Sequence, residues 1–288
     1  METTRELIKK YNIVAKKALG QNFLVDTNAI EDILDSAEID KDDLVIEIGP
    51  GLGSMTAEIA KRAGKLVAIE LDDKLVPILS TYLFGLDVEI INKDVLKVNF
   101  DEEIINKFGT KEDGTPYKVK VVSNLPYYIT TPIIMKLLED GIKAELMIFM
   151  VQLEVAERIC ATPGGKEYGA LSVAIRYYSE PELLFRVPPH SFIPRPNVES
   201  AVVRLKIRPK PYSEEVDRKV FFKTVKAAFG QRRKTLVNAL ANSGIFQINK
   251  EGLKDVLTSM GLSEDIRGEK LSIDLFIALA KLIEKRYN

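Results

Sequence analysis

The chain has 288 residues, of which 46% are hydrophobic and 29% are charged, and its formal net charge is −1. This composition is typical of a globular protein in water, and the single cysteine excludes an internal disulfide framework and suits a reducing cytoplasm. Because no apolar run approaches the roughly 20 residues that span a bilayer, and residues 1–17 lack the apolar core of a signal peptide, we expect no membrane segment and no secretion signal.

Charge is unevenly distributed along the chain. Residues 1–110 carry 13 basic and 21 acidic side chains, whereas residues 111–288 carry 28 and 21. The basic excess is concentrated in residues 186–234, with 13 basic against 4 acidic side chains. A basic segment in a nearly neutral protein favours a surface that faces a polyanion. The alternative is chance clustering on a solvated surface.

Helical and strand-like patterns alternate over residues 26–151. Apolar residues at helical spacing predict helices, and short apolar runs rich in β-branched residues predict strands. The strands are apolar on both faces, which is typical of a parallel sheet covered by helices. In chain order we expect a helix at 26–38, a strand at 44–49, a helix at 54–62, a strand at 66–70, a helix at 73–82, strands at 88–91 and 118–122, a helix at 132–139 and a strand at 145–151.

The pattern changes near residue 208, where Pro209 and Pro211 interrupt the chain. Before this point the sequence predicts one more helix and two strands, and after it only helices. We therefore predict an α/β domain over residues 1–208 and an all-helical domain over residues 209–288. The expected elements are a helix at 170–178, strands at 183–187 and 201–207, and helices at 216–229, 234–242, 250–260 and 272–287.

The segment Glu47–Gly53 lies between the first strand and a helix, and its glycines are spaced Gly-x-Gly-x-Gly. Gly49 and Gly51 would let the backbone approach a ligand closely. Dinucleotide-binding loops use Gly-x-Gly-x-x-Gly instead, and Pro50 also disfavours that interpretation. A tight turn with a purely structural role is the remaining alternative.

Two acidic residues follow neighbouring strands at the same predicted sheet edge. Glu70 ends the second strand, where a carboxylate can accept both hydroxyls of a ribose. Asp94 follows the third strand, where it can accept an adenine amino group. Open α/β sheets bind ligands at this carboxyl edge. By contrast, we expect Asp72, Asp73 and Asp101 to be solvated surface acids.

The segment from Val121 to Tyr127 contains the groups that would hold an amine. The side-chain oxygen of Asn124, together with a backbone carbonyl before Pro126, can accept both hydrogens of an adenine amine. Tyr127 offers a ring on which a base removed from its helix can stack. His190 and Cys160 show no triad or metal spacing, so we expect no metal site, a core position for Cys160, and a structural or phosphate-facing role for His190.

Four motifs occur in an order typical of one family: Lys17–Leu24, Glu47–Gly53, Asn124–Tyr127 and Phe192–Val198. The chain closely resembles the universal small-subunit rRNA adenine N6,N6-dimethyltransferases from about residue 16 to 207, with a weaker match at 229–234. The resemblance implies a Rossmann-like, seven-stranded class I methyltransferase sheet followed by a small helical domain. It also implies that S-adenosylmethionine methylates two adjacent adenosines near the 3′ end of that rRNA, within a pre-small-subunit particle, and we expect a monomer.

The same resemblance implies roles for individual residues. Phe192 would stack the target base opposite Tyr127 from an exposed, rigid loop that also carries the RNA-binding Arg195; plain core packing is the alternative for Phe192. Independently of the resemblance, the basic charge at the start of the predicted helix 234–242 predicts that Arg232, Arg233 and Lys234 bind RNA, because a basic cluster there opposes the helix dipole and phosphate binding would explain it. The implied donor site consists of Gln21, Asn22 and Leu24 as a lid, Gly49 and Gly51 as the loop, Glu70 on the ribose, Asp94 on the adenine, and Asn124 serving both donor and target.

The chain departs from the bacterial pattern at Tyr128, where bacterial relatives usually have Asn, and its helical tail resembles archaeal or eukaryotic members. Large-subunit rRNA methyltransferases that confer macrolide resistance share the motifs and are the alternative enzyme. Glutamine-side-chain methyltransferases use Asn-Pro-Pro-Tyr, and Leu125 argues against them. A third hypothesis is a ribosome-assembly checkpoint in which binding matters more than catalysis.

Overall fold

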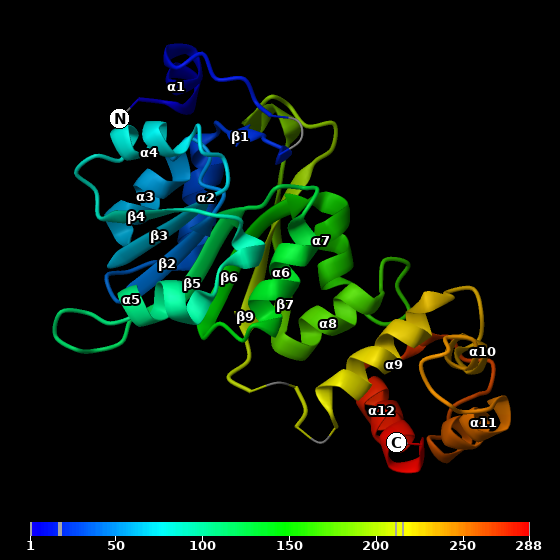
Figure 1. Cartoon of the computed structure of the whole chain (residues 1–288). Coiled ribbons are helices and arrows are strands. Elements are labelled where there is room, and N and C mark those ends of the chain that lie inside the picture. Colours follow the sequence, from blue (N-terminus) through cyan, green and yellow to red (C-terminus); the bar gives the residue numbers. More distant parts are fainter. Residues whose placement is uncertain (1, 17–18, 211, 215, 288) are drawn as a thin grey trace. The chain divides into compact units, whose positions relative to one another are not determined.

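The computed structural model describes residues 2–16, 19–210, 212–214 and 216–287 (Figure 1). The chain forms two compact units. The first combines Met1–Ala156 with Pro181–Ile207, and the second combines Glu157–Glu180 with Arg208–Asn288. The single boundary predicted at residue 208 therefore differs from the observed division, because residues 157–180 group with the helical unit.

Seven strands of the described chain form one sheet, in the order β4-β3-β2-β5-β6-β9-β7. The strands from β4 to β6 pair in parallel, and β9 runs antiparallel to β6. Figure 1 shows helices on both faces of this sheet, so the α/β class implied by the sequence is confirmed. The strands are β2 (Asp43–Ile48), β3 (Lys65–Glu70), β4 (Val88–Asn92), β5 (Lys118–Asn124), β6 (Ala144–Gln152), β7 (Ser179–Val187) and β9 (Ser200–Ile207).

Helices α2 and α3 pack against the sheet through apolar side chains. The side chain of Asp26 accepts hydrogen bonds from the first backbone N–H groups of α2, which the helix itself leaves unpaired. Ile33 and Leu34 of α2 and Ile59 of α3 are then buried against strand residues, each contributing roughly 1.5–3 kcal/mol of burial free energy. The first unit contains α1 (Thr4–Lys10), α2 (Thr27–Ala37), α3 (Ser54–Arg62), α4 (Val76–Tyr82), α5 (Asn106–Phe108) and α6 (Thr130–Glu139), and α7 (Leu153–Cys160) crosses the boundary at residue 156.

A small antiparallel sheet, which the sequence patterns did not predict, joins two motifs that are far apart in the chain. It pairs β1 (Phe23–Leu24) with β8 (Phe192–Ile193), and Leu24 lies opposite Phe192. Each strand has only two residues, too few for an alternating pattern to be recognised. This pairing ties the segment before α2 to the end of the sheet domain.

The second unit is helical and has its own core. Tyr177 stacks on Phe221 with ring centroids 4.8 Å apart, and both rings are buried among apolar residues of the C-terminal helices. Among the described residues, no helix has the length and apolar character needed to cross a membrane. The helices are α8 (Ala170–Tyr178), α9 (Arg218–Gly230), α10 (Leu236–Ala241), α11 (Lys250–Ser259) and α12 (Ile273–Tyr287).

Candidate active site at the carboxyl edge of the sheet

A cavity lies where β2, β3, β4 and β5 end, and its wall includes residues from each following loop. The glycine loop after β2 forms part of this wall. Gly49, Gly51 and Gly53 have φ values of 68°, 59° and 85°, a region that residues with a side chain rarely adopt. A Cβ atom at Gly51 would also lie only 3.2 Å from the ring of Phe23. Both observations explain why glycines are required, and the loop offers backbone rather than side chains to a ligand.

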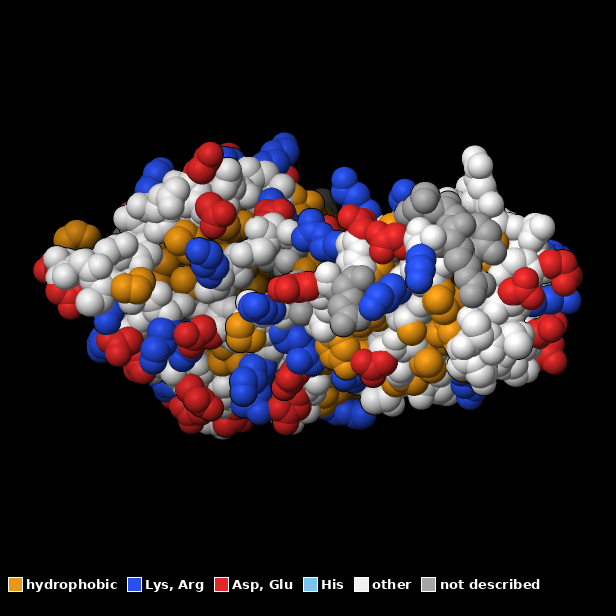
Figure 2. Space-filling model, turned by 90° about the horizontal axis from the view of Figure 1, so that it is seen from below, with side chains coloured by type: hydrophobic (Ala, Val, Ile, Leu, Met, Phe, Trp, Pro, Cys, Tyr) orange, Lys and Arg blue, Asp and Glu red, His pale blue; other side chains and the backbone are white. Residues whose placement is uncertain are grey.

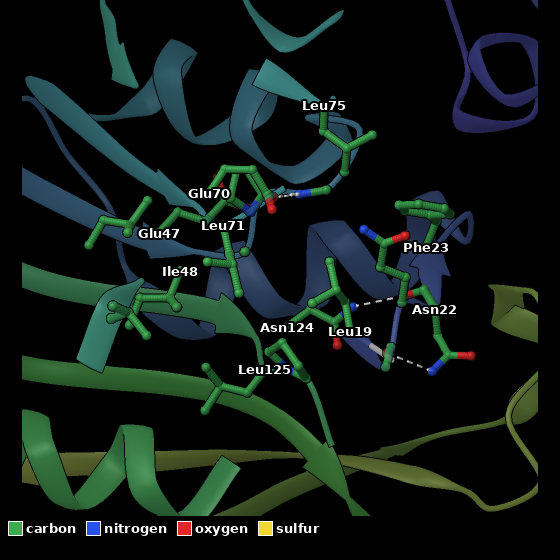
Figure 3. Close-up of a pocket in the computed structure, with 18 of the residues that line it drawn as sticks. Leu19, Asn22, Phe23, Glu47, Ile48, Glu70, Leu71, Leu75, Asn124 and Leu125 are labelled. Carbon is green, nitrogen blue, oxygen red and sulfur yellow. Dashed lines mark hydrogen bonds between the residues drawn. The ribbon is translucent and has the colours of Figure 1, made fainter. Parts of the chain in front are cut away.

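Glu70, at the end of β3, faces the same cavity (Figure 3). Its side chain accepts hydrogen bonds from the backbone N–H of Gly51 at 3.2 Å and of Asp72 at 2.7 Å. Burial raises the pKa of this carboxyl group above its ordinary value, against the effect of the two backbone donors. The carboxylate is therefore fixed in place beside the glycine loop.

Glu47, at the end of β2, is a second buried carboxyl group in the cavity wall. Only 1% of the residue is exposed, and its Oε2 atom has no hydrogen-bond partner among the described residues. Burial raises the pKa of Glu47 to about 8. Near pH 7 the Glu47 carboxyl group is therefore mostly protonated and uncharged in the folded protein.

Asn124, at the end of β5, donates from Nδ2 to the backbone oxygen of Asn22 at 3.3 Å (Figure 3). This bond uses the amide as a donor and leaves its oxygen as the group that can accept from a ligand. The hydroxyl of Tyr127 lies 2.6 Å from Oγ of Ser200, and burial raises the pKa of Tyr127. Asn124 and Tyr127 both line the cavity.

The segment Leu19–Leu24, which we call the lid segment, forms the wall facing these strand ends. Asn22 and Leu24 line the cavity as expected. Gln21 also lines it, but its side-chain amide is bound within the protein: Nε2 donates to Asp72 at 2.9 Å and Oε1 accepts from the backbone N–H of Lys16 at 2.8 Å. Asp94 lines the cavity too, and its side chain accepts from the N–H of Leu96 at 3.0 Å.

The sequence of the chain and the architecture of this site match one family of proteins. A profile of the ribosomal RNA adenine dimethylases matches residues 12–285. The chain belongs to that family. It is 48% identical to the "Ribosomal RNA small subunit methyltransferase A" proteins of Alkaliphilus metalliredigens and Clostridioides difficile, each over 98% of this chain and 96% of the relative.

Solved structures share the fold of this chain. A dimethyladenosine transferase from Plasmodium falciparum has the same fold, with a TM-score of 0.74, 22% identity and coverage of 88% of this chain and 94% of that one. The 23S rRNA methyltransferase ErmE has a TM-score of 0.68 at 25% identity and covers 91% and 100%. The archaeal character expected from the helical tail is not supported, because the bacterial relatives cover the tail as well.

For this dimethylase, the structure corrects the position expected for Phe192. Only 1% of its surface is exposed, and its ring packs in the core with residues such as Leu34 and Val202 rather than standing on an exposed loop. The pairing of β8 with β1 draws the residue inward. Phe192 is not in the cavity wall, whereas Arg195, a few residues later, is exposed.

The basic residues before α10 do not begin a helix. The helix starts at Leu236, because the side chain of Thr235 caps it by accepting from the N–H of Asn238. The guanidinium of Arg232 donates to the backbone oxygens of Lys166 at 2.7 Å and Tyr168 at 3.1 Å. Arg232 is therefore bound within the helical unit, although it is exposed like Arg233 and Lys234.

Sequence reasoning missed Leu71 and Tyr128 in the cavity wall, and it missed the burial of Asp72, which is not part of that wall. Asp72 is buried rather than solvated, and it binds Lys16 and Gln21. Leu71 and Tyr128 line the cavity with 48% and 54% of their surfaces exposed. Leu71 directly follows Glu70 at the end of β3, and this position could have predicted that it lines the cavity. Cys160, expected in the core, is half-buried at the end of α7.

Proposed function

We propose that this dimethylase transfers methyl groups from S-adenosylmethionine to N6 of two adjacent adenosines in the 3′-end hairpin of small-subunit rRNA, within a pre-small-subunit particle in the cytoplasm. We expect it to act as a monomer. The observation that carries the proposal is the amide of Asn124, whose nitrogen is bound by Asn22 and whose oxygen remains for an amine. The 48% identity with small-subunit methyltransferases over nearly the whole chain supports the choice of rRNA.

The residues around the cavity fit S-adenosylmethionine, a cation that contains a nucleoside. Glu70 would accept the ribose hydroxyls, and Asp94 would accept the adenine amino group, with Leu71 and Val95 as apolar walls for the base. The side-chain-free loop at Gly51 would allow close approach of the methionine portion. When bound, S-adenosylmethionine supplies a methyl group that is already activated on a sulfonium.

The chain's own residues would act on the target adenine. Its amine is a poor nucleophile because the nitrogen lone pair is delocalised into the ring. Acceptance of one amine hydrogen by Asn124 and of the other by the backbone carbonyl before Pro126 would turn the lone pair towards the methyl group. Positioning and fixed dipoles then supply the rate, and no covalent enzyme intermediate is needed. Tyr127, held by Ser200, would stack the base.

The experiment compares the parent with Asn124→Ala on small-subunit particles that lack the modification. We expect turnover to fall far more than RNA affinity, because the acceptor matters most while the amine reorganises in the transition state. Asn28→Ala, an exposed change in α2, is the matched control. Primer extension on both rRNAs locates the methyl groups.

Three results would contradict parts of the proposal. Full activity of Asn124→Ala on matured substrate would exclude the proposed mechanism. Methylation of large-subunit rRNA alone would favour the activity named for ErmE, whose fold this chain shares. Rescue of subunit maturation by an inactive Asn124→Ala variant would favour the assembly checkpoint.

A further inference from the structure

The lid segment is held over the cavity at two separate points. On the β5 side, the backbone oxygen of Asn22 accepts from Nδ2 of Asn124 at 3.3 Å. On the β3 side, the side chain of Gln21 donates to Asp72 at 2.9 Å. The chain just before the lid is fixed to the same carboxylate, because Nζ of Lys16 lies 2.6 Å from Asp72 Oδ1.

Asp72 is a buried carboxylate that can bind Lys16 and Gln21 stably. Its side chain is 2% exposed, and it also accepts from the backbone N–H of Lys74 at 3.1 Å. Burial raises the pKa of Asp72, but the hydrogen bonds from Lys16, Gln21 and Lys74 outweigh burial and leave the pKa below its ordinary value. The carboxylate is therefore charged and fully paired in the folded protein.

Asp72 is also connected to the donor-binding carboxylate. Its backbone N–H donates to Oε1 of Glu70 at 2.7 Å. Asp72 therefore contacts both Glu70, which would bind the ribose, and the lid segment, which covers the cavity. On the opposite side, the lid carbonyl of Asn22 determines which way the amide of Asn124 faces. A displacement of the lid would remove that constraint.

We propose that Asp72 is a positioning residue for the methyl transfer: it holds the lid segment closed through Lys16 and Gln21, and the closed lid holds the Asn124 amide with its oxygen towards the target amine. This proposal rests on the proposed function of Asn124. It assigns to Asp72 a role that acts through the lid, without contact with the reacting atoms.

The main test uses Asp72→Asn, which keeps the size of the side chain and removes its charge. Donor dissociation should become faster by about tenfold, and the single-turnover rate at saturating donor should fall several-fold, because the Asn124 amide loses its orientation. Affinity for rRNA should stay unchanged. Lys16→Met should give the same changes to a smaller degree, and Lys16→Arg should restore the parent values.

A matched control is the ion pair between Lys65 and Asp87 at the other end of β3, whose nitrogen and oxygen lie 2.5 Å apart. Lys65→Met removes a lysine from an ion pair without touching the lid, and it should leave donor dissociation and turnover at parent values. If Asp72→Asn does not fold, Lys16→Met decides the question, because Lys16 is 38% exposed and its removal leaves Asp72 still bound to Gln21.

A second readout does not depend on activity. Without donor, hydrogen exchange in the lid segment should be at least several-fold faster in Asp72→Asn than in the parent, whereas exchange in β5 should not change. Parent exchange and parent donor dissociation in both Asp72→Asn and Lys16→Met would overturn the proposal. Failure of the parent to methylate small-subunit rRNA would instead count against the proposed function, and the exchange result would still judge the role of Asp72.

Discussion

Glu70 is held in place before any ligand arrives, since Gly51 and Asp72 donate to its carboxylate. If it binds the donor ribose, Glu70→Ala should weaken donor binding by roughly 1.5–3 kcal/mol, the range for hydrogen bonds to a charged group. Isothermal calorimetry would show this as a loss of about tenfold or more. Glu89→Gln, on exposed β4 surface, is the control, and unchanged affinity in Glu70→Ala would mean that the ribose binds elsewhere.

The buried Glu47 carboxyl group makes the free energy of unfolding depend on pH. Its pKa is about 8 in the folded state against an ordinary value of 4.5, so the folded state binds this proton more tightly than the unfolded chain. The contribution of Glu47 to the free energy of unfolding is therefore fully present below pH 4.5 and is lost as the pH rises through 8. Glu47→Gln should therefore gain stability relative to the parent across this window, by up to about 1.4 kcal/mol per pH unit.

The measurement for Glu47 is the free energy of unfolding in urea between about pH 5 and 8, without donor, the window in which the folded and unfolded states differ in bound protons. The difference between variant and parent should grow with pH. Glu89→Gln, which changes an exposed carboxyl group, should show a constant difference. Parallel profiles for Glu47→Gln and the parent would show that Glu47 titrates normally.

At the scale of elements, the three basic residues predicted to bind RNA before α10 have different surroundings. Arg232 binds backbone oxygens in its own unit, so replacing it would confuse stability with RNA binding. Arg233→Ala together with Lys234→Ala should weaken binding to small-subunit particles and flatten the slope of log affinity against log salt by about 0.7–0.9 for each phosphate that is no longer bound. Lys107→Ala with Lys118→Ala, two exposed changes in the first unit, should keep the parent slope.

Filter binding at several salt concentrations measures the salt slope of particle binding for the parent and both variants, and donor affinity is a second measurement. Donor affinity should be unaffected, because the cavity is built from residues of the first unit. An equal salt slope in the Arg233 and Lys234 variant and in the parent would place the RNA-binding surface elsewhere. The next basic run in the sequence is Lys9, Lys10, Lys16 and Lys17; Lys9 is the candidate there, because Lys10 and Lys16 form ion pairs and Lys17 lies outside the described residues.

Elements with strong local signals were predicted closely. Helix α3 has the bounds expected from its apolar spacing, as does α8, because each has a glycine at or just beyond an end and an apolar face of helical period. The start of α10 was misplaced by two residues, since the capping role of Thr235 was not recognised. The strands β1 and β8 depend on a partner far away in the chain, which local patterns do not contain.

Within the site, residues at strand ends were predictable and residues defined by long-range contacts were not. Glu70 and Asn124 follow from the rule that ligands bind at the carboxyl edge of a parallel sheet, and both line the cavity. Asp72 looked like one of several surface acids, because its burial depends on Lys16 and Gln21 folding over it. Phe192 looked exposed because its neighbours are prolines and charges, while its own ring is drawn into the core.

For the whole molecule, the net charge of −1 gives little general attraction to RNA. Figure 2 shows one face of the molecule, on which lysine and arginine side chains alternate with acidic ones and no single sign dominates. Many basic groups are neutralised in ion pairs, such as Arg62 with Asp35 and Arg204 with Glu182. We therefore expect RNA binding to depend on local basic groups outside such ion pairs, and we propose the turn at Arg233 and Lys234 for this role.

The contact between the glycine loop and the lid makes two distant positions depend on each other. Gly51 has a φ of 59°, and a Cβ atom there would lie 3.2 Å from Cδ1 of Phe23. An alanine at position 51 would meet both backbone strain and a ring that packs beside it. Reducing Phe23 to a smaller residue relieves only the second problem, so a compensating change can restore only part of the stability. A side chain at position 51 is therefore costly even with a smaller residue at position 23, so Gly51 has the narrower choice of residues.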